Sequence, residues 1–138
     1  MDKYRYNVIV GTAFLAVLLF VSGCDNQTTK EDGVLEGKIS IGPICPVETN
    51  PPAPGCLPTA ETYKAYPVSV WTLDGRNKIA QINPSPDGSY TMDLAPGRYL
   101  VTLENAQTRI GSSNLPAEIS IISNEKTVLN ISIDTGIR

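Results

Sequence analysis

One stretch decides the fold, and it reads Asp87-Gly88-Ser89-Tyr90-Thr91-Met92-Asp93-Leu94-Ala95-Pro96-Gly97-Arg98-Tyr99-Leu100-Val101. Its apolar residues recur at every second position, first from Tyr90 to Leu94 and then from Tyr99 to Leu103. A period of two is typical of strands that bury one face. Proline, glycine, asparagine and aspartate gather at 83–88 and 95–97, where they favour turns. The stretch therefore predicts two strands joined by a tight turn.

The same alternation recurs on both sides of this stretch. The apolar positions of the other expected strands are Leu35, Ile39, Ile41, Tyr66, Val68, Val70, Ile79, Ile82, Ile119, Ile121, Leu129, Ile131 and Ile133. Asp74-Gly75 between two such runs is a hairpin signal. No stretch beyond residue 33 shows helical periodicity, and 109–116 reads as a long loop. Turns at about every ten residues predict an all-β protein, an antiparallel β-sandwich of about seven strands.

The deciding stretch resembles a family signature, D-x-G-x-[FY] followed by L-x-P-G-x-Y-x-V. The signature belongs to carboxypeptidase regulatory-like domains, which share the transthyretin, or prealbumin-like, sandwich. Leu35-Glu36-Gly37-Lys38-Ile39 is similar to the first strand of that family, and the resemblance covers about residues 34–134. It implies a prealbumin-like sandwich that serves as an accessory domain. Such domains pack against enzymes, act as spacers or bind partners, and carry no peptidase centre.

The N-terminus has the pattern of an export signal. Lys3 and Arg5 precede an apolar run at 8–21, which is shorter than the roughly 20 residues that span a bilayer. The following Val21-Ser22-Gly23-Cys24 resembles the lipobox of bacterial lipoproteins, in which the cysteine receives a diacylglycerol thioether and fatty acyl chains such as palmitate. We therefore expect a signal peptide at 1–23, a flexible tether at 24–33 that begins with lipidated Cys24, and the sandwich at 34–138. An uncleaved N-terminal anchor is the alternative.

Composition limits what the domain can bind or catalyse. The chain carries 11 basic and 14 acidic side chains, a net charge of −3. Because no basic block stands out, nucleic acid is not an expected partner. The sequence contains no histidine, which excludes histidine-dependent triads and histidine-ligated zinc. A hydrolase of the transthyretin-related type is disfavoured for the same reason. We expect no catalytic residue, no metal ligand and no cofactor.

The three cysteines divide into one lipidation site and one pair. With Cys24 acylated, Cys45 and Cys56 remain, and an oxidising compartment favours a bridge between them. The enclosed segment is rich in proline, which cannot form a strand ladder. A structural disulfide would constrain that segment. A redox or metal role is the alternative, although the C-x-x-C spacing of a redox pair is absent.

Two apolar side chains are the candidate partner-binding residues. If Val68 and Val70 face inward, Trp71 and Leu73 face outward, where an aromatic side chain can stack on a sugar ring or anchor a protein contact. The alternative is that Trp71 covers a neighbouring strand or the loop closed by the two cysteines.

One lysine and one asparagine are a candidate pair for a covalent cross-link. Lys38 and Asn130 resemble the lysine–asparagine pair of adhesin domains that form isopeptide bonds, with Glu104 as the acid. Both residues fall on the polar phase of their strands, which argues against such a bond.

These observations together predict a non-enzymatic module in the cell envelope. The protein would be anchored in the cell membrane through lipid on Cys24, facing the periplasm or the cell exterior. It would recognise an envelope protein or glycan through strand edges and the loops at 45–56 and 109–116. The alternative is a structural spacer, or a subunit of an envelope assembly without a ligand of its own.

Overall fold

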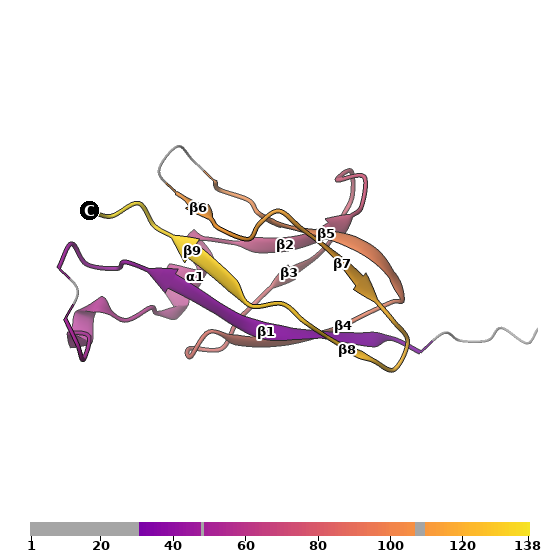
Figure 1. Ribbon diagram of the computed structural model, residues 1–138, viewed down its shortest axis with the longest axis horizontal. Coiled ribbons are helices and arrows are strands. Elements are labelled where there is room, and N and C mark those ends of the chain that lie inside the picture. Colours follow the sequence, from indigo (N-terminus) through magenta and orange to yellow (C-terminus); the bar gives the residue numbers. More distant parts are fainter. Residues whose placement is uncertain (1–30, 48, 107–109) are drawn as a thin grey trace, which may run out of the picture.

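The computed structural model describes residues 31–47, 49–106 and 110–138, which form a sandwich of two β-sheets (Figure 1). The elements in chain order are β1 Gly33–Gly42, a 3-10 turn at Pro54–Cys56, α1 Ala60–Ala65, β2 Val68–Thr72, β3 Lys78–Ile82, β4 Ser89–Leu94, β5 Gly97–Leu103, β6 Gly111–Ser112, β7 Ala117–Ile121, β8 Lys126–Val128 and β9 Ile131–Asp134. The predicted all-β sandwich is confirmed.

The first sheet is organised around the ten-residue strand β1. Its strand order is β4-β1-β9-β6, and β8 also pairs with β1. β4 runs antiparallel to the first half of β1, whereas β8 and β9 lie parallel to it on the other side. The parallel pairs are a difference from the purely antiparallel sandwich that alternation predicts, because periodicity carries no information about strand direction.

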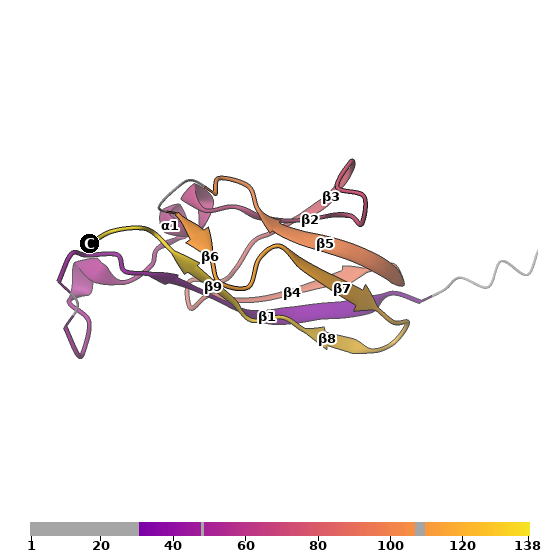
Figure 2. The ribbon, with the colours of Figure 1, turned by 45° about the horizontal axis from the view of Figure 1, so that its top comes forward.

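The second sheet has the order β3-β2-β5-β7, and all of its pairs are antiparallel. Figure 2 shows β2, β3 and β5 as one layer above β1, β4 and β8. The tight turn at 95–97 therefore joins strands of different sheets, because β4 belongs to the first layer and β5 to the second. Alternation along both strands aims their apolar faces into the space between the layers.

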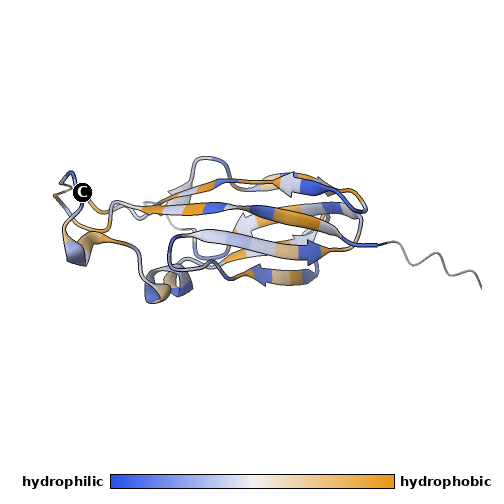
Figure 3. Ribbon diagram, turned by 90° about the horizontal axis from the view of Figure 1, so that it is seen from below, coloured by the Kyte–Doolittle hydropathy of each residue, from blue (hydrophilic) through white to orange (hydrophobic). Residues whose placement is uncertain are grey.

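The core lies between the two sheets. Figure 3 shows the apolar and polar bands that alternate along the strands. The buried apolar residues are Leu35, Ile39, Ile41, Tyr63, Val68, Val70, Ile82, Tyr90, Leu94, Val101, Leu103, Ile119, Ile121, Ile131 and Ile133. Nearly all of them are positions that alternation assigns to strand interiors, and their burial supplies the main stabilisation of the fold.

β8 and β9 act as one strand with an interruption at Leu129–Asn130. The same register continues across it, since Glu36 lies opposite Val128 and Ile39 opposite Ile131. At the break, the Asn130 side-chain oxygen accepts the backbone N–H of Lys38 at 3.0 Å. The Leu129 carbonyl instead accepts the hydroxyl of Tyr90 at 2.5 Å. Side chains thus replace the ladder bonds that the interruption removes.

Three segments differ from the sequence-based expectations. The structure has nine strands in its described residues, because short strands such as β6 add to the expected seven. β6 lies within the predicted loop at 109–116 and pairs with β9. The helix α1 was not expected, since six residues are too few for a helical period. At the other end of the domain, β1 includes Gly33 of the predicted tether, and Ser123 donates a hydrogen bond to the Glu31 carbonyl.

The two ends of the sandwich differ in character. β1 begins at one end, where the turn between β7 and β8 contacts it, and runs toward the other (Figure 1). The segment 43–58 and the C-terminus lie at that far end, which we call the distal end. A ten-residue strand measures about 33 Å. Among the described residues, no helix is both long enough and apolar enough to cross a membrane.

Candidate functional site

Cys45 and Cys56 form a disulfide at the distal end, with their Cα atoms 5.4 Å apart. This pairing confirms the prediction. We call the segment from Cys45 to Cys56 the stapled loop. It begins three residues after β1 ends, and the residues after it lead into α1. The disulfide therefore ties the segment that follows β1 (the first arm) to the segment that leads into α1 (the second arm).

Both arms of the stapled loop are anchored to the sandwich. On the first arm, the hydroxyl of Thr135 donates to the Pro43 carbonyl, and the backbone N–H of Thr135 donates to the Gly42 carbonyl at 3.2 Å. On the second arm, Thr59 caps α1 through reciprocal hydrogen bonds with Thr62. Tyr63 of α1 is buried in the core. Two helix-capping hydrogen bonds and one aromatic anchor fix such a short helix, which would not be stable alone.

The C-terminus adds an ion pair beside the first arm. Arg138 donates to the carboxylate of Asp134 at 2.7 Å. Hydrogen bonds from the Arg138 side chain and from the Gly136 backbone lower the pKa of Asp134 to about 2. Because both side chains are largely exposed, the pair contributes little to stability. It orders the last residues next to the stapled loop.

Two hollows flank the stapled loop and share a wall. One, of about 240 Å³, lies inside the loop and is lined mainly by Ile41, Ile44, Leu57, Pro58 and the disulfide. The other, of about 450 Å³, lies between the edge of β1 and a wall made of Leu57, Pro58, Tyr63, Pro86 and Asp87. We call these two spaces together the distal groove. Leu57 is 51% exposed and borders both of its halves.

Of the distal groove, the sequence predicts only the loop that the disulfide closes. The wall of the groove comes from Leu57-Pro58 and Pro86-Asp87, which are distant in sequence. The pattern at 83–88 predicts only a turn, and no local pattern marks Leu57-Pro58. One local signal was available for α1. Thr59 precedes Ala60-Glu61-Thr62-Tyr63-Lys64-Ala65, a capping residue followed by good helix formers. The proline at 67 then ends the segment.

Trp71 lies on the outer face of the second sheet, because Val68 and Val70 face the core. The ladder places Lys78 on one side of it and Leu100 on the other. Trp71 is only partly exposed, and its indole nitrogen is covered without a hydrogen-bond partner in the described residues. Leu73 is 36% exposed in the turn that follows β2. The two candidate residues therefore point away from the core, but Trp71 offers only part of its ring.

A polar network lies on the same face, one ladder step from Trp71. The fully buried Ser69 donates its hydroxyl to the Glu104 carboxylate at 2.6 Å, and the Lys78 ammonium approaches the same oxygen at 2.6 Å. The hydrogen bonds from Lys78 and Ser69 lower the pKa of Glu104, and the one from Lys78 has the larger effect. The structure thus engages Glu104 with Lys78 and not with Lys38. Asn130 accepts the backbone N–H of Lys38, so the geometry of an isopeptide centre is absent from these three residues.

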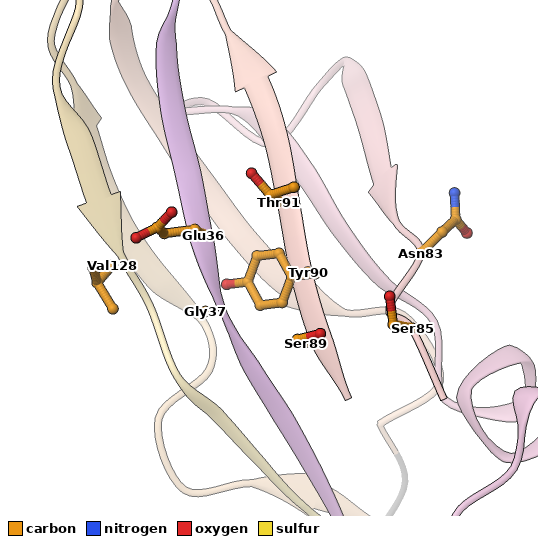
Figure 4. A pocket seen from close by; sticks show the side chains of 8 residues that line it. All are labelled: Glu36, Gly37, Asn83, Ser85, Ser89, Tyr90, Thr91 and Val128. Carbon is orange, nitrogen blue, oxygen red and sulfur yellow. The ribbon is translucent and has the colours of Figure 1, made fainter. Parts of the chain in front are cut away.

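The outer face of the first sheet carries a third hollow, of about 480 Å³ (Figure 4). It is open and its lining mixes polar and apolar groups, with Ser85, Ser89 and Thr91 contributing hydroxyl groups. Its single carboxylate, Glu36, already forms an ion pair with Lys126 at 3.0 Å. The hollow therefore presents hydroxyl groups, one neutralised acid and the apolar side chain of Val128.

No cluster of three metal-ligating side chains occurs within residues 31–47, 49–106 and 110–138. The pKa shifts there have ordinary structural causes. Asp74 and Asp87, for instance, have lowered pKa values because neighbouring hydroxyl and backbone N–H groups donate to them in turns. Cys24, the predicted lipidation site, lies outside the described residues.

Comparisons with known proteins extend only to the fold. No family model matches the chain, and no curated protein does. Among solved structures, the minor pilin GBS52 of the Gram-positive pathogen Streptococcus agalactiae aligns over 75% of this chain with a TM-score of 0.50 and 13% identity. The TIE protein of Bacillus anthracis and a DUF3823 family protein of Parabacteroides merdae each align over 75% of it, with TM-scores of 0.46 and 0.44 and 14% identity.

The chain spans only part of each of these proteins, namely 44% of the pilin, 16% of the TIE protein and 46% of the DUF3823 protein. At 13% identity, the likeness to the pilin supports the β-sandwich and nothing finer. The chain is thus similar in fold to part of that pilin.

Proposed function

We propose that this protein is a lipid-anchored, non-enzymatic recognition module of the cell envelope, built on a sandwich of the carboxypeptidase regulatory-like type. Cys24 carries the lipid, and the distal groove contacts an envelope protein or glycan. The observation that carries the proposal is the arrangement along β1. The strand begins at Gly33, nine residues after Cys24 in the sequence, and ends three residues before the stapled loop. Anchoring at the first end directs the second away from the membrane.

The chemistry of the distal end supports recognition over a purely spacing role. The wall of the distal groove exposes Leu57, which is 51% accessible. Leu57 directly follows Cys56 of the disulfide and precedes Pro58, and both neighbours restrict its backbone. Exposed apolar side chains on a rigid frame lose little conformational entropy when they bind. The lipid adds to this by raising the local concentration of the module at the membrane.

The recognition proposal is tested by site-specific cross-linking in cells of the source organism. A photo-reactive amino acid is placed at Leu57 in the distal groove and, as the control, at Ile79, which is exposed on the edge strand β3. We expect one product of defined mass from position 57 and none of that mass from position 79. Identical products from both positions, or none from position 57 across several growth conditions, would favour the spacer reading.

Lipid attachment is tested separately through Cys24. The wild-type protein should partition with membranes, and its mature N-terminal peptide should carry the acyl mass by mass spectrometry. Cys24→Ala should remain unprocessed, whereas Cys56→Ser, which also removes one cysteine, should be processed normally. Efficient cleavage of the Cys24→Ala chain would overturn the lipoprotein assignment.

A further inference from the structure

We propose that the edge of β1 at Ser40–Gly42, which we call the open edge, binds an uncharged, extended peptide segment of the partner as an added strand. This inference rests on the proposed function and specifies how the partner is held. An added strand is bound by backbone hydrogen bonds along the edge and by side-chain pockets beside it. The open edge and the distal groove supply both.

The hydrogen-bond pattern of β1 shows which groups are free. The carbonyls of Glu36 and Gly42 accept the backbone N–H groups of Leu129 and Thr135, so even-numbered residues of β1 face β8 and β9. The N–H of Ile39 donates to the Gly88 carbonyl at 2.8 Å, so odd-numbered residues face β4. Ile41 follows this alternation. Its N–H and C=O therefore point to the side where β4 would have to continue.

β4 does not continue there. Its ladder with β1 runs only from Leu94 to Ser89, which lies opposite Lys38. Before Ser89 the chain turns away at Gly88, whose φ of +87° is a backbone conformation that glycine tolerates. Among the described residues, no other strand pairs with this side of β1. An unpaired strand edge is a template for pairing with another chain.

The space beside the open edge is shaped and apolar. The larger half of the distal groove is bounded by Ile39 and Ile41 on the strand and by Leu57, Pro58 and Pro86 on the facing wall. The disulfide and α1 hold that wall away from β1, so the chain itself does not close the space. At about 450 Å³ this half is large enough for a few side chains of an extended segment.

The charges at the groove indicate an uncharged occupant. Among the described residues, Lys38 and Asp87 are the charged side chains that line the two halves, and their charges are opposite. Hydrogen bonds from Ser89, and more weakly the positive charge of Lys38, lower the pKa of Asp87, which keeps it ionised beside the lysine. A charged segment would gain no net attraction here and would lose solvation. Peptide groups, spaced along an extended chain, match the N–H and C=O of Ile41 better than sugar hydroxyl groups do.

The proposal is tested on the full lipidated protein in nanodiscs. Random linear peptides displayed on phage are selected on it, and the enriched sequences are synthesised as the probe. Dissociation constants are then measured for the wild-type protein, for Leu57→Arg in the groove wall, and for Val47→Arg. The last is the matched control, because Val47 is an exposed apolar residue within the adjoining stapled loop and lines neither hollow. Each peptide is also methylated at one backbone nitrogen at a time.

We expect neutral, alternating peptides whose affinity falls at least about tenfold in Leu57→Arg and is unchanged in Val47→Arg. N-methylation should abolish binding at alternate positions only, since every second N–H of an added strand faces β1. Exchange of the Ile41 amide hydrogen should slow on binding. Failure to select peptides, equal affinity for both variants, or N-methyl effects without alternation would each overturn the added strand. A specific cross-link at Leu57 alongside such a failure would leave the recognition function in place and remove only its mode.

Discussion

Gly37 of β1 lies directly against the backbone carbonyl of Leu129, in the interruption between β8 and β9. A Cβ at this position would collide with that oxygen and press on the Tyr90 hydroxyl. The collision is with backbone, which cannot rotate away as a flexible side chain can. The glycine is therefore required for the interruption between β8 and β9, and its absence of a side chain shapes the first sheet.

Gly37→Ala should lower the free energy of unfolding by about 3 kcal/mol, because the overpacked backbone must shift. Urea denaturation followed by Trp71 fluorescence measures it. Gly111→Ala is the matched control in a strand, since a Cβ there meets nothing within 4 Å. It should change stability by less than about 0.5 kcal/mol. Equal effects of the two substitutions would contradict the role given to Gly37.

The Tyr90 hydroxyl completes the same arrangement by donating to the Leu129 carbonyl. Tyr90→Phe keeps the ring but leaves that carbonyl without its donor, which should cost about 1 to 3 kcal/mol. The pH dependence provides a second readout. Burial raises the pKa of Tyr90 from 10.0 to about 12, so the unfolded chain loses this proton before the folded protein does.

The stabilisation from the protonated Tyr90 is fully present below pH 10 and is lost as the pH rises from about 10 to about 12. The stability difference between wild type and Tyr90→Phe should therefore shrink by on the order of 2 kcal/mol over that interval. Parallel alkaline denaturation curves for the two proteins would show that Tyr90 is not linked to folding. Tyr63 also has a raised pKa, and because it is present in both proteins its contribution cancels.

The sequence predicts that the Trp71 side chain points away from the core, as it does, but not that the ring is half-buried. Alternation with Val68 and Val70 correctly places the side chain outside the core. How much of the ring stays exposed depends on its cross-strand neighbours Lys78 and Leu100, and strand pairing cannot be read from local pattern. The same reason explains why Glu104 was considered with Lys38, whereas the fold brings it to Lys78.

At the scale of elements, periodicity predicts the strands, whereas the helix is signalled only by its capping residue and its terminating proline. A strand is recognised in a sequence by apolar residues at every second position and by turn residues at its ends. The stretch from Asp87 to Val101 shows both signals. α1 has six residues, fewer than two turns, so no periodicity can reveal it. The two-residue β6 escapes for the same reason. The distal groove depends on these short elements and on chain segments distant in sequence, and it could not be predicted from local patterns.

The stapled loop should behave as a local element and not as part of the core. Its disulfide joins residues 11 apart, and closing a loop of this length stabilises by about 3 kcal/mol in the chain-entropy model. Cys45→Ser/Cys56→Ser should lower the unfolding free energy by about that amount or less. The core contains neither residue, so the strand signature in circular dichroism should persist.

Hydrogen exchange locates the effect of losing the disulfide. Protection should fall at residues 43–58, whereas amides in β2 and β5 should keep theirs until global unfolding. Wild-type protein without reductant is the reference, and Tyr90→Phe, which perturbs the sandwich but not the loop, is the control. Loss of protection throughout the sandwich would mean that the loop belongs to the folding core.

For the whole molecule, the sequence predicts two layers but not their connectivity. Alternating burial requires a sandwich or a barrel, and the sandwich followed from strand number and the family resemblance. The parallel alignment of β1 with β8 and β9 places the first and last strands side by side. Contacts between residues some 92 positions apart in the chain, such as Lys38 with Asn130, decide this arrangement.

Because of this connectivity, the start of β1 and the stapled loop lie at opposite ends of the sandwich. The turn between β7 and β8 lies beside the start of β1, where the Asn124 N–H donates to the Asp32 carbonyl at 3.1 Å. The stapled loop lies at the opposite end (Figure 1). If lipid on Cys24 anchors the chain, the first end faces the membrane and the second is about 33 Å farther out. Proposed recognition at the distal groove depends on this orientation.

Paramagnetic broadening tests the orientation directly. The lipidated, isotope-labelled protein is placed in nanodiscs with and without a gadolinium-chelating lipid, and amide signal intensities are compared. Amides at 122–125 should lose much more intensity than those of Val47 and Leu57, because the broadening falls steeply with distance from the bilayer surface. A control protein that begins at Asp25, and so has neither the leader nor the lipid, should lose none. Equal losses at both ends would mean that the sandwich lies flat on the membrane, which would bury the distal groove against lipid and contradict recognition there.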